Sequence, residues 1–125
     1  MKPYTILLVE DTTDIRIMMR LMLEMHGFLV IEAADGLEAI EQLLGSEKPD
    51  AILLDMSLPK VDGYQSARVI RKIPGCSEIP IIACTAHNRW EWRAKSISAG
   101  CNAFVPKPVD FDELDRLLVR LIPSA

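Results

Sequence analysis

Residues 5–11 have the sequence Thr-Ile-Leu-Leu-Val-Glu-Asp, an apolar run that ends in two acidic residues. A short run of β-branched and apolar residues is typical of a strand that is buried on both faces of a parallel sheet. Four more runs of this kind follow along the chain: Leu29 to Ala33, Ala51 to Leu54, Ile79 to Cys84 and Ala103 to Val105. The sequence therefore predicts a sheet of five strands.

The segments between these strands carry apolar residues at helical spacing. The last segment is the clearest, with Asp110 and Glu113 resembling a capping pair at its start. The five sets are Ile15, Met18, Met19, Met22 and Met25; Leu37, Ile40, Leu43 and Leu44; Ala67, Ile70 and Ile73; Ala94 and Ile97; and Phe111, Leu114, Leu118, Leu121 and Ile122. We expect an α/β fold with one doubly wound (βα)5 domain over residues 1–125, flavodoxin-like, with a parallel sheet in the order 2-1-3-4-5.

Composition limits the classes of function. The chain has 125 residues and a formal net charge of -4, without a cluster of Lys or Arg, so direct nucleic-acid binding is not expected. No apolar stretch reaches the roughly 20 residues of a membrane span, and the N-terminus lacks a signal-peptide pattern, which together predict a cytoplasmic protein. Cys76, Cys84 and Cys101 lack Cys-x-x-Cys spacing and predict neither a disulfide frame nor a zinc site. We expect Cys84 and Cys101 to be small buried residues.

Ionisable and hydroxyl side chains stand where the predicted strands end. Glu10 and Asp11 follow the first strand, Asp55 the third, Thr85 the fourth and Lys107 the fifth. Because ligands of such sheets bind outside the carboxyl ends of the strands, we expect all five to converge on one edge. Taken singly, each has a simpler interpretation: the acidic pair and the threonine as helix caps, and the lysine as a solvated surface charge.

Three converging carboxylates predict a divalent cation. Two like charges about 4 Å apart repel by ~1 kcal/mol in water and by ~4 kcal/mol at an effective dielectric constant of about 20. A site of oxygen ligands without His or Cys suits Mg2+, which also binds phosphate oxygens. Asp55 would then attack phosphorus and form an aspartyl phosphate, while Lys107 and the hydroxyl of Thr85 contact the equatorial phosphate oxygens.

Four motifs, in this order, carry a family resemblance. They are Leu7-Leu8-Val9-Glu10-Asp11; Asp55-Met56-Ser57-Leu58-Pro59 running to Asp62-Gly63; Cys84-Thr85-Ala86; and Phe104-Val105-Pro106-Lys107-Pro108. Together they resemble the motifs of the response-regulator receiver family, with the usual spacing and over the whole chain. Four motifs in order are far more specific than any one of them.

The resemblance implies a role for each residue of these motifs. Asp55 would be the phosphoacceptor, and Mg2+ would be held directly by Asp11, Asp55 and the backbone carbonyl of Ser57, with Glu10 acting mainly through metal-bound water. Thr85 and Lys107 would bind the phosphoryl group, and Phe104 occupies the position of the switch aromatic. The Lys107-Pro108 bond is commonly cis in this family, and positions 57 and 87, here Ser57 and His87, tune the lifetime of the phosphoryl group.

The resemblance also implies partners. A sensor histidine kinase or a histidine phosphotransfer protein would donate the phosphoryl group. Phosphorylation would draw Thr85 inward, let Phe104 turn, and change the surface of the fourth helix, fifth strand and fifth helix, to which a downstream effector protein would bind. The sequence leaves a homodimer open. We expect Trp90 to be partly buried and Trp92 to face solvent, where it would anchor a partner or a second copy.

Two other functions share parts of this pattern. A phosphatase of the haloacid-dehalogenase type also attacks through an Asp at a strand end. Enzymes of that type share an Asp-x-Asp pattern, and here Ser57 stands in place of the second Asp. A pseudo-receiver, a folded interaction module, usually lacks the acceptor, the acidic pair or the lysine, and none is lost here. We therefore expect a domain that catalyses only its own phosphoryl transfer and dephosphorylation, and not a turnover enzyme.

Overall fold

The computed structural model describes residues 3–45, 47–56, 62–86 and 90–123, and of residues 90–92 it describes the backbone alone. Strands and helices alternate along these residues, as the sequence predicts. The strands are β1 (Thr5–Val9), β2 (Leu29–Ala33), β3 (Ala51–Asp55), β4 (Ile81–Thr85) and β5 (Ala103–Pro106). The helices are α1 (Thr13–Met25), α2 (Gly36–Leu43), α3 (Gly63–Lys72), α4 (Trp90–Ser98) and α5 (Phe111–Leu121).

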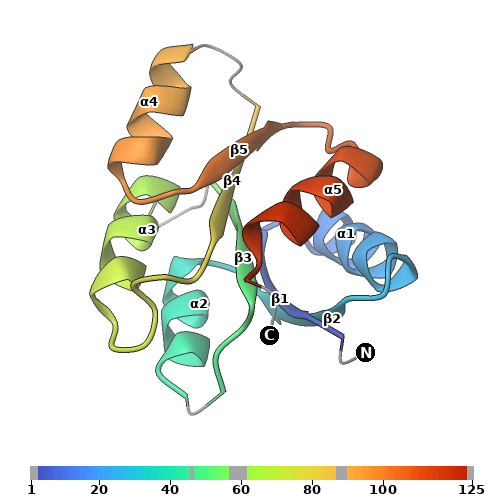
Figure 1. Ribbon diagram of the computed structural model, residues 1–125, viewed down its shortest axis with the longest axis horizontal. Helices are drawn as coiled ribbons and strands as arrows, with labels where there is room; N and C mark the ends of the chain where they lie inside the picture. Colours follow the sequence, from blue (N-terminus) through green and yellow to red (C-terminus); the bar gives the residue numbers. More distant parts are fainter. Residues whose placement is uncertain (1–2, 46, 57–61, 87–89, 124–125) are drawn as a thin grey trace.

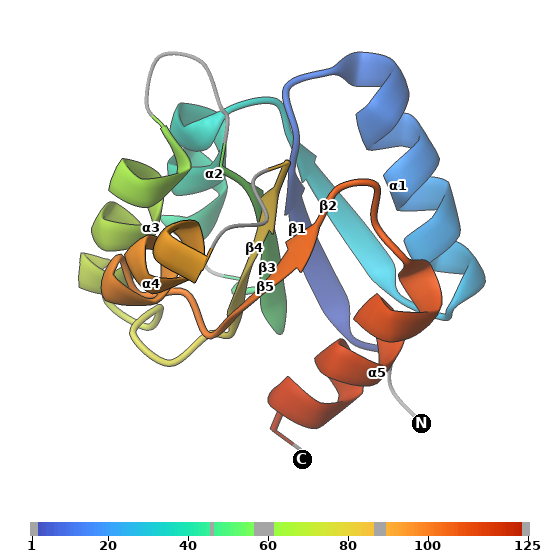
Figure 2. The same cartoon turned by 90° about the horizontal axis from the view of Figure 1, so that it is seen from above.

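The strands form one parallel sheet in the order β2-β1-β3-β4-β5, which confirms the predicted topology. Helices α1 and α5 cover one face of the sheet, and α2, α3 and α4 cover the other (Figures 1 and 2). The strand expected from Ile79 begins two residues later, at Ile81. The physical reason is Pro80, which has no N–H to donate to the ladder.

The sheet is buried on both faces, which explains the continuous apolar runs. In β1, Ile6 and Leu8 point into the cluster beneath α1 and α5, and Leu7 and Val9 point into the cluster beneath α2, α3 and α4. Each fully buried side chain of this size contributes about 1.5–3 kcal/mol relative to its exposed state. The core therefore fixes the strands, and through them the place where each strand ends.

The apolar stripe expected for α1 is wrong in part. Its buried residues are Met19 and Leu23, whereas Ile15, Met18 and Met25 are exposed by 42%, 51% and 79%. The helix has apolar residues on several sides, and two of its arginines pair with a glutamate of β2. The pattern alone therefore did not identify the face that packs on the sheet.

The remaining stripes are confirmed to different degrees. In α3 and α5 the expected core residues Ala67, Ile70, Leu114 and Leu118 are buried, and so are Ile73 and Ile122 directly after these helices. For α2, the expected core residue Leu43 is buried, together with Ala39, whereas Leu37 and Leu44, directly after the helix, are exposed, contrary to expectation. In α4, Ile97 is exposed, also contrary to expectation, and Ala99 directly after the helix is buried.

Local signals in the sequence behave as expected at the helix starts. Asp110 is the N-cap of α5, and its Oδ1 accepts hydrogen bonds from the backbone N–H groups of Asp112 and Glu113, at 3.0 and 3.2 Å. Asp62 caps α3 in the same way by accepting from the Gln65 N–H at 2.8 Å.

Among the described residues, no helix is both long and apolar enough to cross a membrane.

All three cysteines are buried and unpaired with one another. Burial raises the pKa of the Cys84 thiol to about 12 and that of Cys101 to about 11. Both thiols therefore stay protonated at neutral pH and are poor nucleophiles. This confirms their assignment as small core residues.

Candidate functional site

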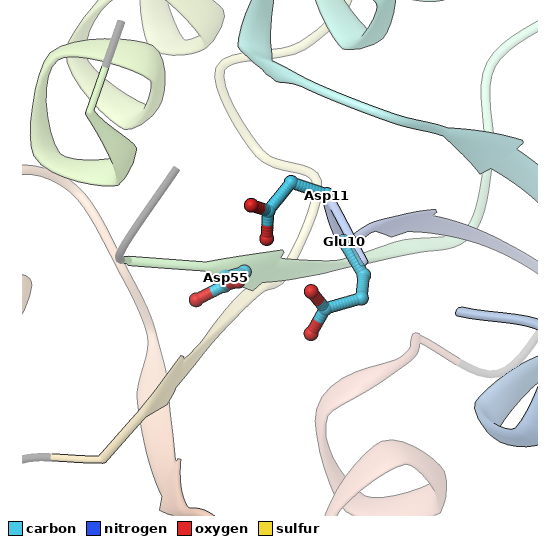
Figure 3. Close-up of side chains that lie close together, drawn as sticks. All are labelled: Glu10, Asp11 and Asp55. Carbon is cyan, nitrogen blue, oxygen red and sulfur yellow. The ribbon is translucent and has the colours of Figure 1, made fainter. Parts of the chain in front are cut away.

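Three carboxylates meet where β1 and β3 end. Glu10 and Asp11 directly follow β1, and Asp55 is the last residue of β3. Carboxylate oxygens of the three residues all lie within 4.8 Å of one another (Figure 3). The sheet register causes this meeting, because Val9 pairs with Leu54 and the next residue on each strand therefore reaches the same edge. Glu10 and Asp55 are each only 2% exposed, whereas Asp11 is exposed to solvent.

Lys107 joins two of these carboxylates. Its backbone N–H donates to the carbonyl oxygen of Thr85 at 2.8 Å, which holds the start of the segment after β5 beside the end of β4. Its Nζ then lies 3.1 Å from Asp55 Oδ1 and 3.3 Å from Glu10 Oε1. The Lys107-Pro108 peptide bond is cis. The lysine is therefore part of the site and not a solvated surface charge.

The electrostatics of the site follow from burial and crowding. Burial raises the pKa of Glu10, a hydrogen bond from the Thr12 N–H opposes this, and the charge of Asp55 raises the pKa again. For Lys107, burial favours the neutral amine, but contacts with Asp55 and Glu10 outweigh it and raise the pKa. The lysine is thus a permanent cation between two acids. Three carboxylates against one ammonium still leave excess negative charge at the site.

The two predicted switch residues lie on neighbouring strands. Thr85 is the buried last residue of β4, and Phe104 is a partly buried residue of β5. The guanidinium carbon of Arg93, on α4, lies 4.4 Å from the centre of the Phe104 ring. Ser57 and His87 lie outside the described residues, as do the side chains of Trp90 and Trp92.

The donor chemistry of the site fits Mg2+. The cluster offers carboxylate oxygens only, without thiolate or imidazole, and this is the ligand type that Mg2+ prefers. Asp11 and Asp55 would hold the ion, with Glu10 as a further acidic partner. A divalent cation would also compensate the charge that Lys107 leaves unbalanced.

Comparisons with known proteins agree with this geometry. A family model described as the response regulator receiver domain matches residues 6–119. The chain belongs to this family. The receiver domain of sensor histidine kinase PA1611 from Pseudomonas aeruginosa, crystallised with a magnesium ion coordinated in its active-site cleft, is 37% identical and matches with a TM-score of 0.89 over 98% of this chain and 100% of that one.

Two of the curated relatives are longer proteins than this chain. The sensor histidine kinase CheAY of Helicobacter pylori is 33% identical over 95% of this chain and 15% of its own length. Response regulator MprA of Mycolicibacterium vanbaalenii is 35% identical over 90% of this chain and 47% of its own length. The chain thus spans less than half the length of these two relatives.

The unbalanced charge of the site predicts that Mg2+ stabilises this receiver domain. Millimolar Mg2+ is expected to raise the melting temperature of the wild type, because the ion binds the folded state and relieves repulsion among the acids. In Asp11→Ala, which removes one exposed carboxylate, the rise should be much smaller. Thermal unfolding with Mg2+ or with EDTA measures both shifts, and shifts of equal size would refute the assignment of Asp11 to the site.

The raised pKa of Glu10 predicts a pH dependence in the absence of metal. A carboxyl group whose pKa is higher in the folded than in the unfolded chain stabilises the fold below its unfolded value, 4.5, and this contribution is lost as the pH rises through the folded pKa. The free energy of unfolding of the wild type should therefore fall relative to that of Glu10→Gln as the pH rises through this window. Urea unfolding in EDTA at several pH values measures the difference in free energy of unfolding between the two proteins. A difference that does not change with pH would contradict a raised pKa of Glu10 in the folded state.

Proposed function

We propose that this receiver domain accepts a phosphoryl group on Asp55 in a Mg2+-dependent reaction, and that the phosphorylated form changes its protein partner. The observation that carries this proposal is the position of Asp55. Its carboxylate lies buried at the end of β3, 3.1 Å from Lys107 Nζ and beside two further acids. Such a carboxylate is poised to attack phosphorus next to a bound cation and an ammonium group.

Phosphoryl transfer to Asp55 needs a nucleophilic carboxylate, and cationic and hydroxyl groups that contact the phosphoryl oxygens. A carboxylate oxygen of Asp55 forms the new bond to phosphorus while the bond from phosphorus to the donor breaks, so that the electron pair leaves with the donor. Lys107 and the Thr85 hydroxyl contact the phosphoryl oxygens, over which negative charge is spread during transfer. When bound, Mg2+ supplies further neutralisation of that charge. Glu10 keeps the Lys107 ammonium oriented through its contact at 3.3 Å.

The phosphoryl donor in this proposal is a sensor histidine kinase or a histidine phosphotransfer protein, and the acceptor of the signal is a downstream effector. The effector surface is formed by α4, β5 and α5. A cavity of about 370 Å³ lies there, with Phe104, Ile97 and Leu117 among its apolar lining and Arg93, Arg116 and Arg120 among its charged lining. A homodimer and a cytoplasmic location stay predictions of the sequence.

The switch links the site to this surface. Phosphorylation adds close to two negative charges at Asp55, which would draw Thr85 towards the phosphoryl oxygens. Phe104 would then turn inward and leave the guanidinium of Arg93, which now covers its ring at 4.4 Å. The arginine would become available to a partner. This is a shift between two arrangements of the same surface.

We further propose that the domain does not turn over external substrates. The Lys107 ammonium, the acidic pair and Asp55 are all in place, which disfavours a pseudo-receiver that has lost phosphorylation. Ser57 replaces the second acid of the haloacid-dehalogenase pattern, which disfavours a phosphatase of that type. Steady release of phosphate from a phosphate monoester would instead support a phosphatase function.

The proposed function is tested with a small phosphodonor. Acetyl phosphate and Mg2+ are added to the wild type, and the intact mass is recorded. We expect the added mass of one phosphoryl group with Mg2+ and no addition when EDTA replaces the metal. An unmodified protein in the presence of Mg2+, or equal modification in EDTA, would refute the proposal.

A further inference from the structure

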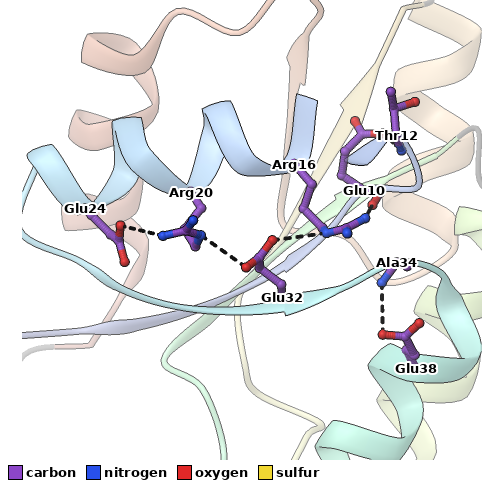
Figure 4. A network of polar contacts seen from close by, with 8 residues as sticks. All are labelled: Glu10, Thr12, Arg16, Arg20, Glu24, Glu32, Ala34 and Glu38. Carbon is purple, nitrogen blue, oxygen red and sulfur yellow. Dashed lines mark hydrogen bonds and ion pairs between the residues drawn. The ribbon is translucent and has the colours of Figure 1, made fainter. Parts of the chain in front are cut away.

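The side chain of Arg16 connects α1 to the segment that carries the acidic pair. Its Nη1 donates to the backbone carbonyl oxygen of Glu10 at 2.9 Å, and its Nε donates to Glu32 Oε1 on β2 at 3.1 Å (Figure 4). Only 16% of the Arg16 side chain is exposed. The planar guanidinium can hold two acceptors at fixed relative positions, which a lysine ammonium on a flexible stem does less well.

Glu32 is itself held in place. Its second oxygen, Oε2, lies 3.1 Å from Arg20 Nε, and Arg20 Nη1 donates to Glu24 Oε1 at 3.0 Å. Both oxygens of Glu32 therefore contact arginines of α1, one helical turn apart. Figure 4 shows this row of alternating charges between α1 and β2, with Arg16 at the end nearest Glu10.

Glu10 is consequently fixed at both of its backbone groups. Its N–H donates to the carbonyl oxygen of Ala33 at 3.1 Å, and its carbonyl oxygen accepts from Arg16 at 2.9 Å. Its carboxylate accepts from the Thr12 N–H at 3.1 Å and from Lys107 at 3.3 Å. The Glu10 carbonyl belongs to the peptide unit that continues into Asp11, so the contact with Arg16 sets the direction in which Asp11 leaves the strand.

We propose that Arg16 is a positioning residue of the phosphoryl-transfer site. Anchored on Glu32, it fixes the peptide unit between Glu10 and Asp11 and thereby keeps both carboxylates turned towards Asp55. The inference rests on the proposed function for its purpose, and on the contacts above for its geometry. Without this contact, repulsion within the acidic cluster is free to turn the peptide unit and move Asp11 away.

The role of Arg16 is geometric and not a matter of net charge. Its guanidinium is already paired with Glu32, so little of its charge is left to neutralise the acidic cluster. Arg16→Lys keeps the charge and should still fail, because one ammonium does not reproduce the two-point contact. Arg20→Met is the matched control. Arg20 lies one turn further along the same helix and contacts the other carboxylate oxygen of Glu32, Oε2, and its second contact is with Glu24 rather than with Glu10.

The test is the dissociation constant of Mg2+, measured by titration calorimetry without a phosphodonor. Each variant is studied well below its melting temperature, with folding verified by circular dichroism. We expect Arg16→Met and Arg16→Lys to bind Mg2+ with a dissociation constant at least about tenfold higher than that of the wild type. Mutation of a residue that holds a metal ligand in place typically lowers metal affinity by about 10- to 100-fold. Arg20→Met should lose much less, and phosphorylation by acetyl phosphate should slow in the same order.

Several outcomes would overturn the proposal. Wild-type affinity in Arg16→Met is one, and an equal loss in Arg20→Met, which would indicate general loosening of α1, is another. If Arg16→Met does not fold, Glu32→Gln takes its place, because it weakens the anchor and keeps the shape; unchanged affinity in that variant overturns the proposal too. If the wild type binds Mg2+ but accepts no phosphoryl group, the proposed function is refuted. The role of Arg16 in positioning the acidic pair for Mg2+ is then still supported by the Mg2+ affinities of the variants.

Discussion

Replacing Lys107 with Met is expected to slow phosphorylation of Asp55 by about 10²- to 10³-fold, the usual cost of losing a preorganised group that meets developing charge. The ammonium lies 3.1 Å from Asp55 Oδ1, so it is already where a phosphoryl oxygen on Asp55 would need a cation. Methionine keeps a long flexible side chain and removes the charge. The rate is measured by intact mass against time, with acetyl phosphate and saturating Mg2+.

Lys107→Arg is the control for this prediction. It keeps the charge but carries it on a larger planar group, so we expect a rate between those of the wild type and Lys107→Met. A rate for Lys107→Met within a small factor of wild type would contradict the assignment of Lys107 to phosphoryl binding. In that case the ion pairs with Asp55 and Glu10 serve only the folded structure.

Replacing Gly63 with Ala is expected to lower the free energy of unfolding by about 1–3 kcal/mol, the usual range for overpacking. Gly63 is the first residue of α3 and presses against the end of β3. A Cβ there would lie 2.5 Å from the Cα of Met56 and 2.8 Å from the carbonyl oxygen of Asp55. Backbone atoms do not move aside as a flexible side chain does, so the start of α3 has to shift.

Gly45→Ala provides the comparison, because a Cβ at that position meets one backbone oxygen, that of Gln42, at 3.2 Å. Urea unfolding of both variants gives the two differences. We expect a clearly larger loss of stability for Gly63→Ala than for Gly45→Ala. Equal losses would show that the contact between α3 and β3 is looser than the structure has it.

The sequence predicted the fold and the gathering of the site for one physical reason. In a parallel sheet every strand delivers the residue after its end to the same edge, so Glu10, Asp55 and Lys107 had to meet once the strands were placed. Their separation along the chain did not matter. The family resemblance of the motifs added the roles, and the geometry is compatible with those roles for the residues that the structure describes.

What the sequence did not reveal are contacts that depend on backbone groups and distant partners. Arg16 donates to a backbone carbonyl, which has no signature in the sequence, and its anchor Glu32 lies on β2, 16 residues further along the chain. The close approach of Gly63 to Met56 is likewise visible only in three dimensions. In α1, apolar residues on several sides left the buried face undecided, and Met18 proved to be exposed.

The intact mass of Asp55→Asn decides whether Asp55 itself receives the phosphoryl group. Asparagine has nearly the same shape as aspartate, so the variant should fold. It lacks the nucleophilic carboxylate, so it should not form an acyl phosphate. After treatment with acetyl phosphate and Mg2+, we expect one added phosphoryl group on the wild type and none on Asp55→Asn. A phosphoryl group added to the variant would rule out Asp55 as the acceptor.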